Sequence, residues 1–450
     1  MLLTRNAAVA ALFALLGGAC LPGACGGGDA SSPPGSAGAG AGGGGAGTAG
    51  AGGTPSAGAA GAGASGAAGQ AAGAAGATTA GWASAGTVVS CTIERLTNPG
   101  DVRVLDWAPC GDGCQAATLR VGPLGASSKS TRLLSAGTRV TEQADGPRLL
   151  LMAQINQFLV TAADGTLLDA YRPKGTGCAA HAGSTWADRH ALLFYHDKGT
   201  SALEFGVLIG APGVAPNLFP LNYPIGDGPQ WMALGPARLG FDWGAPGAVS
   251  VSVVDGTSFT NFAPATAKGP VFLVEGPAAT PDGFLVREAR QTTETLAFSD
   301  GVMATQPWGS APDAYDGSVV FADTHVAWRR GFNKKDINVY ESVELWAAEY
   351  TPNPAQVKPY KVGAVESTAA FVYYPAMAGA YGRAALILGN NQAPNVVVWD
   401  VAKKVKLLDM PLPVQGKEGA GGLLGLTKKD VWVIVGAGLD SRILRLALPG

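Results

Sequence analysis

The chain has 450 residues and a formal net charge of −2, and 14% of its residues are charged. This balance argues against nucleic acid as a partner, because a surface that binds a duplex usually carries an excess of Lys and Arg. Glycine, with 67 residues, is concentrated toward the N-terminus, so composition divides the chain into a glycine-rich front part and a globular remainder.

Residues 1–24 have the pattern of a secretory signal sequence. Arg5 forms a short positive region, Ala7 to Leu16 form an apolar stretch, and small residues follow. An apolar stretch of this length is too short to span a bilayer as a mature helix. The sequence therefore predicts export.

Two cysteines in this region follow small residues, in LGGAC ending at Cys20 and in LPGAC ending at Cys25. Both resemble the lipobox of bacterial lipoproteins, in which the cysteine becomes the lipidated N-terminus. That family prefers Leu three residues before the cysteine, whereas Leu16 and Leu21 stand four before it. We predict lipidation at Cys25, with Cys20 as the alternative lipidated residue. Ordinary cleavage that gives a secreted protein without lipid is the other alternative.

The remaining cysteines support the choice of Cys25. Cleavage before this residue leaves an even set suited to two disulfides in an oxidising compartment, Cys91, Cys110, Cys114 and Cys178. The motif CGDGC lacks the Cys-x-x-Cys spacing typical of zinc sites, so a local bond between Cys110 and Cys114 is predicted instead. Cys91 and Cys178 then form the second pair, although four cysteines allow three pairings.

Residues 25–86 are predicted to be a disordered Gly/Ala/Ser tether. No charged residue occurs from Ala30 to Ile93. Such a composition has almost nothing to bury, so it cannot offset the entropy of ordering. A flexible chain of about sixty residues has an r.m.s. reach of roughly 40 Å. The tether would hold residues 87–450 at a distance from a membrane, with the lipid as the sole membrane contact.

Residues 87–450 are predicted to be all-β. Asp-Gly dipeptides, a strong tight-turn signal, separate short runs rich in β-branched and aromatic residues. The runs recur in sets of three, and the sets begin at Pro147, His190, Ala237, Gly283, His325, Arg383 and Asp430. The intervals of roughly 42 to 58 residues correspond to one blade of a β-propeller.

The run VVVWDVAKKVKLLD, with Trp399–Asp400, resembles the third strand, turn and fourth strand of a WD-type or YVTN-type propeller blade. The resemblance implies the β-propeller superfold and no particular family, because the Gly-His element of true WD40 repeats is missing. The segment from Val102 fits as an earlier blade, which makes seven or eight blades. The last set is one strand short, and we predict that Thr87–Thr97 completes it by pairing with Ser441–Leu448.

Candidate chemical sites are few. His181, His190 and His196 lie close together in sequence, but His190 and His196 stand at the two ends of one predicted strand, roughly 20 Å apart. They are interpreted as ordinary loop histidines, and no metal, cofactor or catalytic residue is assigned. Trp328, Arg329 and Arg330 are predicted to be exposed ligand contacts, since aromatic rings and guanidinium groups carry much of the binding energy at interfaces. The alternative is a solvated loop between strands, with Trp328 in the core.

These patterns favour an exported, lipid-anchored propeller that binds a cell-envelope protein, peptide or polysaccharide. The alternative is a secreted propeller enzyme of the glycosidase, lyase or lactonase class. Such an enzyme would need carboxylates or a metal to converge at the channel mouth. The sequence does not determine which of its Asp and Glu residues face the channel, so enzymatic activity is left open.

Overall fold

The computed structural model describes residues 81–449 except 121, 125–132, 135–137, 154–155, 200–202, 222–230, 237, 243–248, 255–258, 261–270, 274–277, 291–292, 300–305, 308–318, 337–338, 372–376, 391–392, 417 and 438–439. The predicted signal sequence and lipidation sites, and most of the predicted tether, lie outside these residues. Within them, β1 begins at Gly81, ahead of the predicted domain boundary at residue 87.

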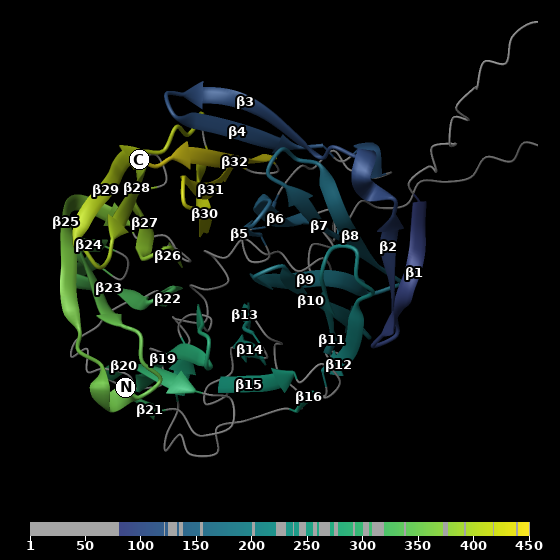
Figure 1. Ribbon diagram of the computed structural model, residues 1–450, viewed down its shortest axis with the longest axis horizontal. Coiled ribbons are helices and arrows are strands. Elements are labelled where there is room, and N and C mark those ends of the chain that lie inside the picture. Colours follow the sequence, from purple (N-terminus) through teal and green to yellow (C-terminus); the bar gives the residue numbers. More distant parts are fainter. Residues whose placement is uncertain are drawn as a thin grey trace, which may run out of the picture. The chain divides into compact units, whose positions relative to one another are not determined.

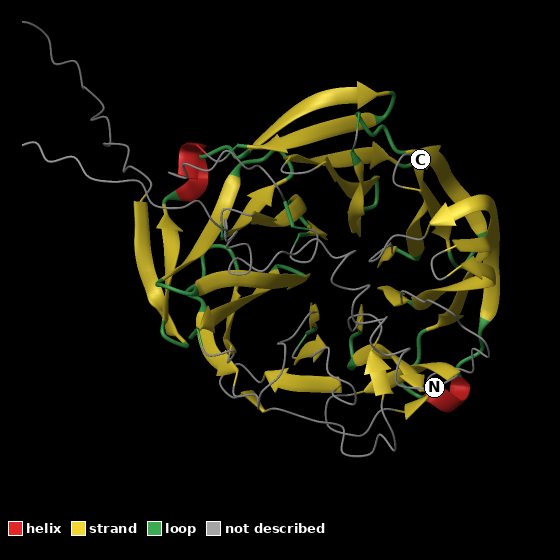
Figure 2. Ribbon diagram, turned by 180° about the vertical axis from the view of Figure 1, so that it is seen from behind, coloured by secondary structure: helices red, strands yellow, loops and turns green. Residues whose placement is uncertain are grey.

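The described strands form seven antiparallel sheets that follow one another around a common axis (Figure 1). Strands make up nearly all of the regular structure, and the described residues contain no α-helix (Figure 2). The described helical turns are three short 3-10 segments, η1 (Pro99–Asp101), η2 (Gly122–Leu124) and η3 (Pro354–Gln356).

The sheets are numbered here in ring order, and each is given from its outermost strand to its innermost or the reverse. Sheet 1 has the order β1 (Gly81–Val88), β2 (Cys91–Thr97), β8 (Leu167–Lys174), β7 (Gln157–Ala162), β6 (Gly146–Ala153), β5 (Arg139–Gln143). Sheet 2 has the order β12 (Asn217–Leu221), β11 (Leu203–Gly210), β10 (Arg189–Asp197), β9 (Cys178–Trp186). Sheet 3 has the order β13 (Trp231–Leu234), β14 (Arg238–Asp242), β15 (Val249–Val254), β16 (Phe259–Thr260).

The other sheets repeat this plan. Sheet 4 has the order β17 (Val271–Leu273), β19 (Phe284–Arg290), β20 (Thr293–Ser299), β21 (Gln306–Pro307), and β18 (Ala278–Ala279) also pairs with β19. Sheet 5 has the order β22 (Val319–Ala322), β23 (His325–Asp336), β24 (Val339–Glu349), β25 (Tyr360–Phe371). Sheet 6 has the order β26 (Met377–Ala380), β27 (Arg383–Asn390), β28 (Ala393–Asp400), β29 (Val405–Pro411). Sheet 7 has the order β3 (Leu105–Gly111), β4 (Cys114–Leu119), β32 (Asp440–Ala447), β31 (Asp430–Ala437), β30 (Gly419–Leu426).

Consecutive antiparallel sheets of four main strands, arranged radially, define a β-propeller. The predicted fold class, an all-β propeller, is confirmed. The predicted position of Trp399–Asp400 is also confirmed, because both residues lie in β28, the third strand of sheet 6.

Ring closure differs from the prediction. The N-terminal strand that pairs with β32 is β4, with Ala117 opposite Ile443, and not the segment Thr87–Thr97. That segment forms the end of β1 and all of β2, and β2 pairs with β8 of sheet 1. The segment from Val102 is therefore not a blade of its own, because β3 and β4 complete the truncated last sheet. Closure is still achieved by an N-terminal strand, which removes the exposed edge that an incomplete sheet would leave.

Apolar side chains fill the spaces between neighbouring sheets. Leu119 of β4, Leu149 of β6 and Trp432 of β31 lie between sheets 7 and 1, and none is more than 3% exposed. Because each sheet packs against a neighbour on both faces, successive residues of a strand are buried. This explains continuous apolar runs such as Val431–Val435, which are at most 2% exposed.

Candidate functional site

The predicted ligand contacts lie on β23 in sheet 5. Trp328 is 5% exposed and Arg329 is 2% exposed, so neither offers the exposed surface on which the prediction rested. Trp328 packs in the apolar cluster around Leu285 and Val326, between sheets 4 and 5. Arg329 is adjacent in the strand and points to the opposite face. The expectation of an exposed patch is therefore not met at these two residues.

Arg330, the third predicted contact, is half-buried and belongs to a charged cluster on sheet 5. Its guanidinium carbon lies 4.9 Å from the centroid of the Trp346 ring. The Trp346 indole N–H donates to Glu344 over 2.7 Å, and the Lys361 ammonium lies 2.6 Å from the same carboxylate. Burial acts to raise the pKa of Glu344, but the hydrogen bonds from Lys361 and Trp346, together with the positive charges of Lys361 and Arg330, leave the pKa below its usual range. The cluster joins neighbouring strands of one sheet, as a structural ion-pair group does.

The two edges of the ring differ in how the chain crosses them. At one edge, here called the short-turn edge, the first strand of most sheets turns directly into the second, for example through residues 144–145, 187–188, 323–324 and 381–382, and the third strand leads to the fourth, with a longer connection at residues 350–359. At the other, the long-connection edge, the fourth strand of one sheet leads to the first strand of the next. Most of these connections are longer than the turns between first and second strands, and they comprise residues 120–138, 222–230, 261–270, 308–318, 372–376 and 412–418.

Hydrogen bonds link the turns of the short-turn edge from sheet to sheet. Three arginines occupy the same position, the first residue of the second strand, and each donates to a carbonyl oxygen in the next sheet's turn. The bonds are Arg189 to Pro236 over 2.8 Å, Arg238 to Asp282 over 2.8 Å, and Arg383 to Lys428 over 2.6 Å.

The other neighbouring sheets are linked by different groups. The side chain of Gln143 donates to the carbonyl of Ala187 and so joins sheets 1 and 2, and the hydroxyl of Tyr350 donates to Asp282 over 3.0 Å and joins sheets 4 and 5. The amide of Tyr381 donates to Asp323 over 2.6 Å and joins sheets 5 and 6, and the amide of Lys428 donates to Glu142 over 2.7 Å and joins sheets 7 and 1. Every neighbouring pair of sheets is thus joined at this edge, which stiffens the ring there.

An aromatic pair also connects sheets that are not neighbours. The ring of Trp186, at the end of β9 in sheet 2, stacks on Phe321 of β22 in sheet 5 with centroids 6.5 Å apart and planes 16° apart. Phe321 in turn meets Tyr350 edge to face at 5.2 Å. Because β9 and β22 are inner strands of sheets 2 and 5, the pair spans the centre of the ring near the short-turn edge.

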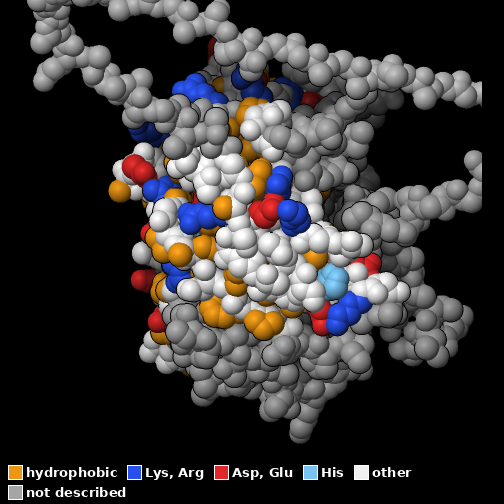
Figure 3. Space-filling view, turned by 90° about the vertical axis from the view of Figure 1, so that its right-hand side faces the viewer, with side chains coloured by type: hydrophobic (Ala, Val, Ile, Leu, Met, Phe, Trp, Pro, Cys, Tyr) orange, Lys and Arg blue, Asp and Glu red, His pale blue; other side chains and the backbone are white. Residues whose placement is uncertain are grey.

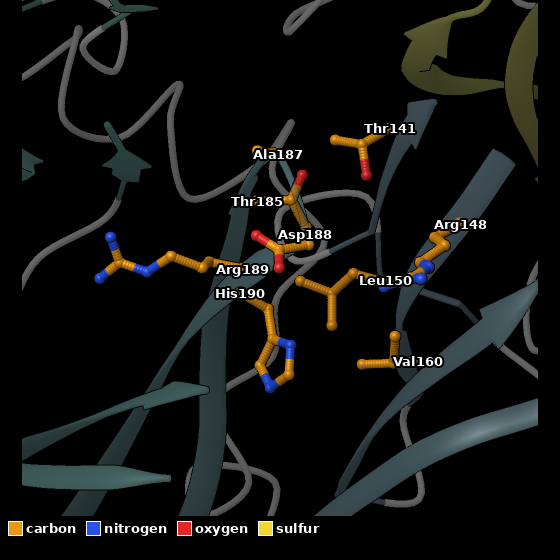
Figure 4. Close-up of a pocket in the computed structure, with 9 residues that line it drawn as sticks. All are labelled: Thr141, Arg148, Leu150, Val160, Thr185, Ala187, Asp188, Arg189 and His190. Carbon is orange, nitrogen blue, oxygen red and sulfur yellow. The ribbon is translucent and has the colours of Figure 1, made fainter. Parts of the chain in front are cut away.

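A small pocket opens between sheets 1 and 2 close to this edge (Figure 4). Asp188 and Thr185 of sheet 2 face Leu150, Val160 and Arg148 of sheet 1, whereas the side chain of Arg189 points away (Figure 4). The pocket has room for about one water molecule. It is too small for a sugar ring or a peptide side chain, so it is not assigned as a substrate site.

A group of hydrogen-bonded polar side chains lies next to His190, which lines the pocket. Arg95 of β2 donates from two nitrogens to the carboxylate of Asp169, each over 2.8 Å, and Tyr171 donates to the same carboxylate over 2.8 Å. The ring of His190 lies 5.5 Å from the Tyr171 ring. Asp169 is 1% exposed and His190 2% exposed. The contact between the rings of Tyr171 and His190 connects this polar group of sheet 1 to sheet 2.

The three clustered histidines are strand residues and not loop residues, which corrects their interpretation. His181 lies in β9, and His190 and His196 lie near the two ends of β10. His190 and His196 therefore do stand at opposite ends of one strand. Among the described residues, no group of three or more His, Cys, Asp or Glu side chains is placed to hold a metal ion.

Acid pH is expected to destabilise the protein through His190. Burial lowers the pKa of His190 from 6.5 to about 3. The unfolded chain takes up this proton below pH 6.5, whereas the folded chain does so only near pH 3, so stability is lost as pH falls through this window. The loss is about 3 kcal/mol at pH 4 relative to pH 7. Chemical denaturation at both pH values measures it in wild type and in His190→Gln.

The His190→Gln variant should lose this part of the pH dependence, because glutamine does not titrate. The variant His196→Gln keeps His190 and serves as the matched control. An equal difference between pH 7 and pH 4 in wild type and His190→Gln would contradict the assignment.

Both predicted disulfides are confirmed. Cys91 bonds to Cys178, and Cys110 bonds to Cys114 across the turn between β3 and β4. Two disulfides indicate an oxidising, extracytoplasmic environment. In the part of the chain that the structure describes, no helix has the length and apolarity needed to cross a membrane.

The arginines of the short-turn edge were missed by sequence reasoning, although a signal for them exists. Arg189, Arg238 and Arg383 are each the first residue of an apolar second strand, in RHALLFY, RLGFD and RAALIL. An alignment of the repeated three-strand sets places the three arginines at one equivalent position.

No family model and no curated protein matches the sequence. Among solved structures, the chain is similar to YCF48 from Cyanidioschyzon merolae, with 13% identity and a TM-score of 0.42 over 70% of this chain and 98% of that chain. The WD40 domain of SCAP from fission yeast is 10% identical with a TM-score of 0.38, over 79% of this chain and 98% of that chain. A post-proline cleaving enzyme from Rickettsia typhi is 9% identical with a TM-score of 0.42, over 70% of this chain and 53% of that chain. Likenesses this distant carry no argument about function, and the fold assignment depends on the sheet topology.

Proposed function

We propose that the chain is an exported, lipid-anchored propeller that binds a cell-envelope protein or polysaccharide at its long-connection edge. The observation that carries this proposal is the contrast between the two edges. The short-turn edge is linked from sheet to sheet by hydrogen bonds and spanned by Trp186 and Phe321. The opposite edge carries most of the long connections. Binding residues are disproportionately found on loops held by a rigid scaffold.

The sequences of the long connections are suited to binding. Tyr223 occurs in 222–230, Phe262 in 261–270, Trp308 in 308–318, and the pair Tyr373 and Tyr374 in 372–376. Aromatic residues dominate the binding energy of protein interfaces, and their faces also stack on sugar rings. These residues take the place of Trp328 and Arg329 as the proposed contacts.

Anchoring is proposed from the front part of the chain together with the disulfides. The lipobox-like motif ending at Cys25 and the signal-like residues 1–24 favour export with lipidation. Such an anchor would place a binding body at a membrane surface, where its partner would be part of the envelope.

The proposal predicts capture that depends on the long-connection edge. The mature wild-type chain should retain a partner from a solubilised envelope fraction, and mass spectrometry should find lipid on Cys25. Trp308→Ala combined with Tyr374→Ala should weaken binding of that partner about 30-fold, which corresponds to loss of one strong contact of about 2 kcal/mol. Binding is measured by surface plasmon resonance.

The matched control is Lys429→Ala, which alters an exposed residue of the short-turn edge and should leave binding unchanged. Equal binding by the double variant would place the site elsewhere. Absence of any retained partner, together with turnover of a panel of polysaccharides and lactones, would replace the scaffold with the enzyme alternative.

A further inference from the structure

A hairpin outside the ring's own strands begins within the last residues of the predicted tether. Strands β1 and β2, here called the strap (residues 81–97), are added beyond β8, the outermost of the four main strands of sheet 1. Only β2 pairs with β8, with Thr92 opposite Lys174 and Arg95 opposite Tyr171. Because β4 closes the ring, the strap completes no sheet, so its presence calls for another explanation.

The strap reaches from sheet 1 onto sheet 2. It runs along the outside of sheet 1 with its turn end beside β12 (Figure 1). Val88 packs so closely on Gly206 of β11 that a Cβ there would lie 2.5 Å from the Val88 side chain. A Cβ on Gly86 would likewise lie 2.5 Å from Leu218 of β12. The strap therefore covers the seam between two neighbouring sheets.

Covalent and polar contacts fasten the strap to both sheets. Cys91, the first residue of β2, is bonded to Cys178, the first residue of β9 in sheet 2. Arg95 binds Asp169 of sheet 1 and also donates to the carbonyl of Val214 in sheet 2's outer turn over 2.9 Å. The outer side of sheets 1 and 2 otherwise mixes charges of both signs with apolar side chains (Figure 3).

The turn of the strap is held in an unusual conformation next to this disulfide. Val89 and Ser90 have φ of 45° and 65°. A two-residue turn with positive φ at both positions normally uses Asn or Gly, and a β-branched residue there is rare. Such a conformation persists when its surroundings hold it. Here the adjacent Cys91–Cys178 bond and the packing of Val88 on Gly206 hold it.

We propose that the strap fastens the tether to the ring. Under tension from the tether, the Cys91–Cys178 bond prevents the strap from opening beyond Cys91. The proposal rests on the proposed N-terminal anchoring. Tension enters at Gly81, which pairs with Thr97, and the ladder opens pair by pair toward Val88 and Cys91. At Cys91 a covalent bond replaces hydrogen bonds, so the force passes into β9 and does not open β2 from β8.

Pulling on single molecules of the mature chain by its two ends tests this role. β1 has one paired neighbour, whereas β32 at the other end is paired on both sides, so the strap opens first. In wild type the first step should free residues 81–90, a contour length of about 35 Å. In Cys91→Ser/Cys178→Ser, residues 91–97 should follow at the same or lower force and add about 25 Å. The matched control Cys110→Ser/Cys114→Ser should keep the wild-type first step.

A first step of equal length in wild type and Cys91→Ser/Cys178→Ser would overturn the proposal. Hydrogen exchange of the unstretched variants provides the second measurement. Exchange in the Cys91→Ser/Cys178→Ser variant should rise at least tenfold in residues 81–97 and stay unchanged in sheets 5 to 7. Loss of protection throughout the ring would also overturn it, because the bond would then be part of the ring's own fold. Neither measurement involves a bound partner, so failure of the binding proposal is seen separately.

Discussion

Replacing Ala117 by glutamate is expected to lower the free energy of unfolding by about 4 kcal/mol or more. Ala117 is fully buried in the closing strand β4, between Trp107 of β3 and Ile443 of β32. A glutamate would place a larger side chain and an unpaired carboxylate in this apolar interface, where neither water nor a partner can solvate it. Because β4 joins the two ends of the ring, the loss should appear as a lower midpoint in chemical denaturation and as aggregation during gel filtration.

The control is Gln115→Glu, which adds the same charge two residues earlier in the same strand. Gln115 is exposed and lies opposite Arg445 of β32, so the change should stay within about 0.5 kcal/mol. If Ala117→Glu were as stable as Gln115→Glu, β4 would not be the closing strand.

Removing Arg95 is expected to be the second severe change. Arg95→Met leaves the carboxylate of Asp169 buried without its charged partner, although Tyr171 and the Ala170 amide still donate hydrogen bonds to it. Breaking a buried ion pair on one side destabilises a protein by about 3–5 kcal/mol. By contrast, Arg120→Met removes an ion pair with Asp106 whose side chains are 56% and 47% exposed, and its effect should be about 1 kcal/mol or less.

Two further observations test whether the buried charge is the cause. Arg95→Met/Asp169→Leu should recover most of the lost stability, because both charged groups are then gone. Burial raises the pKa of Asp169, and loss of Arg95 raises it further. Since the folded-state pKa is then above the unfolded one, the penalty is full at high pH and shrinks as pH falls through the folded pKa. A gap between Arg95→Met and wild type that stays constant from pH 8 to pH 5, with no recovery in the double variant, would contradict this account.

Sequence by itself determined the fold class and most of the second, third and fourth strands of the sheets. Six of the seven repeated sets correspond to the second, third and fourth strands, as in Arg383–Asn390, Ala393–Asp400 and Val405–Pro411 of sheet 6, and the set from Asp430 corresponds to the second and third strands of sheet 7. The second and third strands are packed between two neighbouring sheets, so they carry continuous apolar runs that can be recognised in the sequence. The Asp-Gly turns are equally local, and Asp112–Gly113 and Asp164–Gly165 form turns with positive φ at the glycine.

The inner strands escaped detection for the opposite reason. Cys178–Trp186 (CAAHAGSTW) and Gly419–Leu426 (GAGGLLGL) are rich in glycine and alanine. Sheets converge toward the axis, and little room is left there for large side chains. The β-branched and aromatic residues that identify a strand in sequence are therefore scarce in them.

Only the tertiary structure decided which strand closes the ring and which charged residues are buried. Apolar and polar residues alternate in both Thr87–Thr97 and Cys114–Leu119, so either segment could pair with β32. The path of the chain brings Cys114–Leu119 beside β32, and this segment forms the pair. Trp328 and Arg329 stand beside Arg330 in a basic, aromatic stretch that suggests an exposed surface, yet β23 runs between two other strands of sheet 5, and both residues are buried. Burial depends on what packs against a residue from distant parts of the chain, and pairing depends on proximity in space. Neither burial nor strand pairing is encoded in the local pattern of side chains, so only the assembled ring determines them.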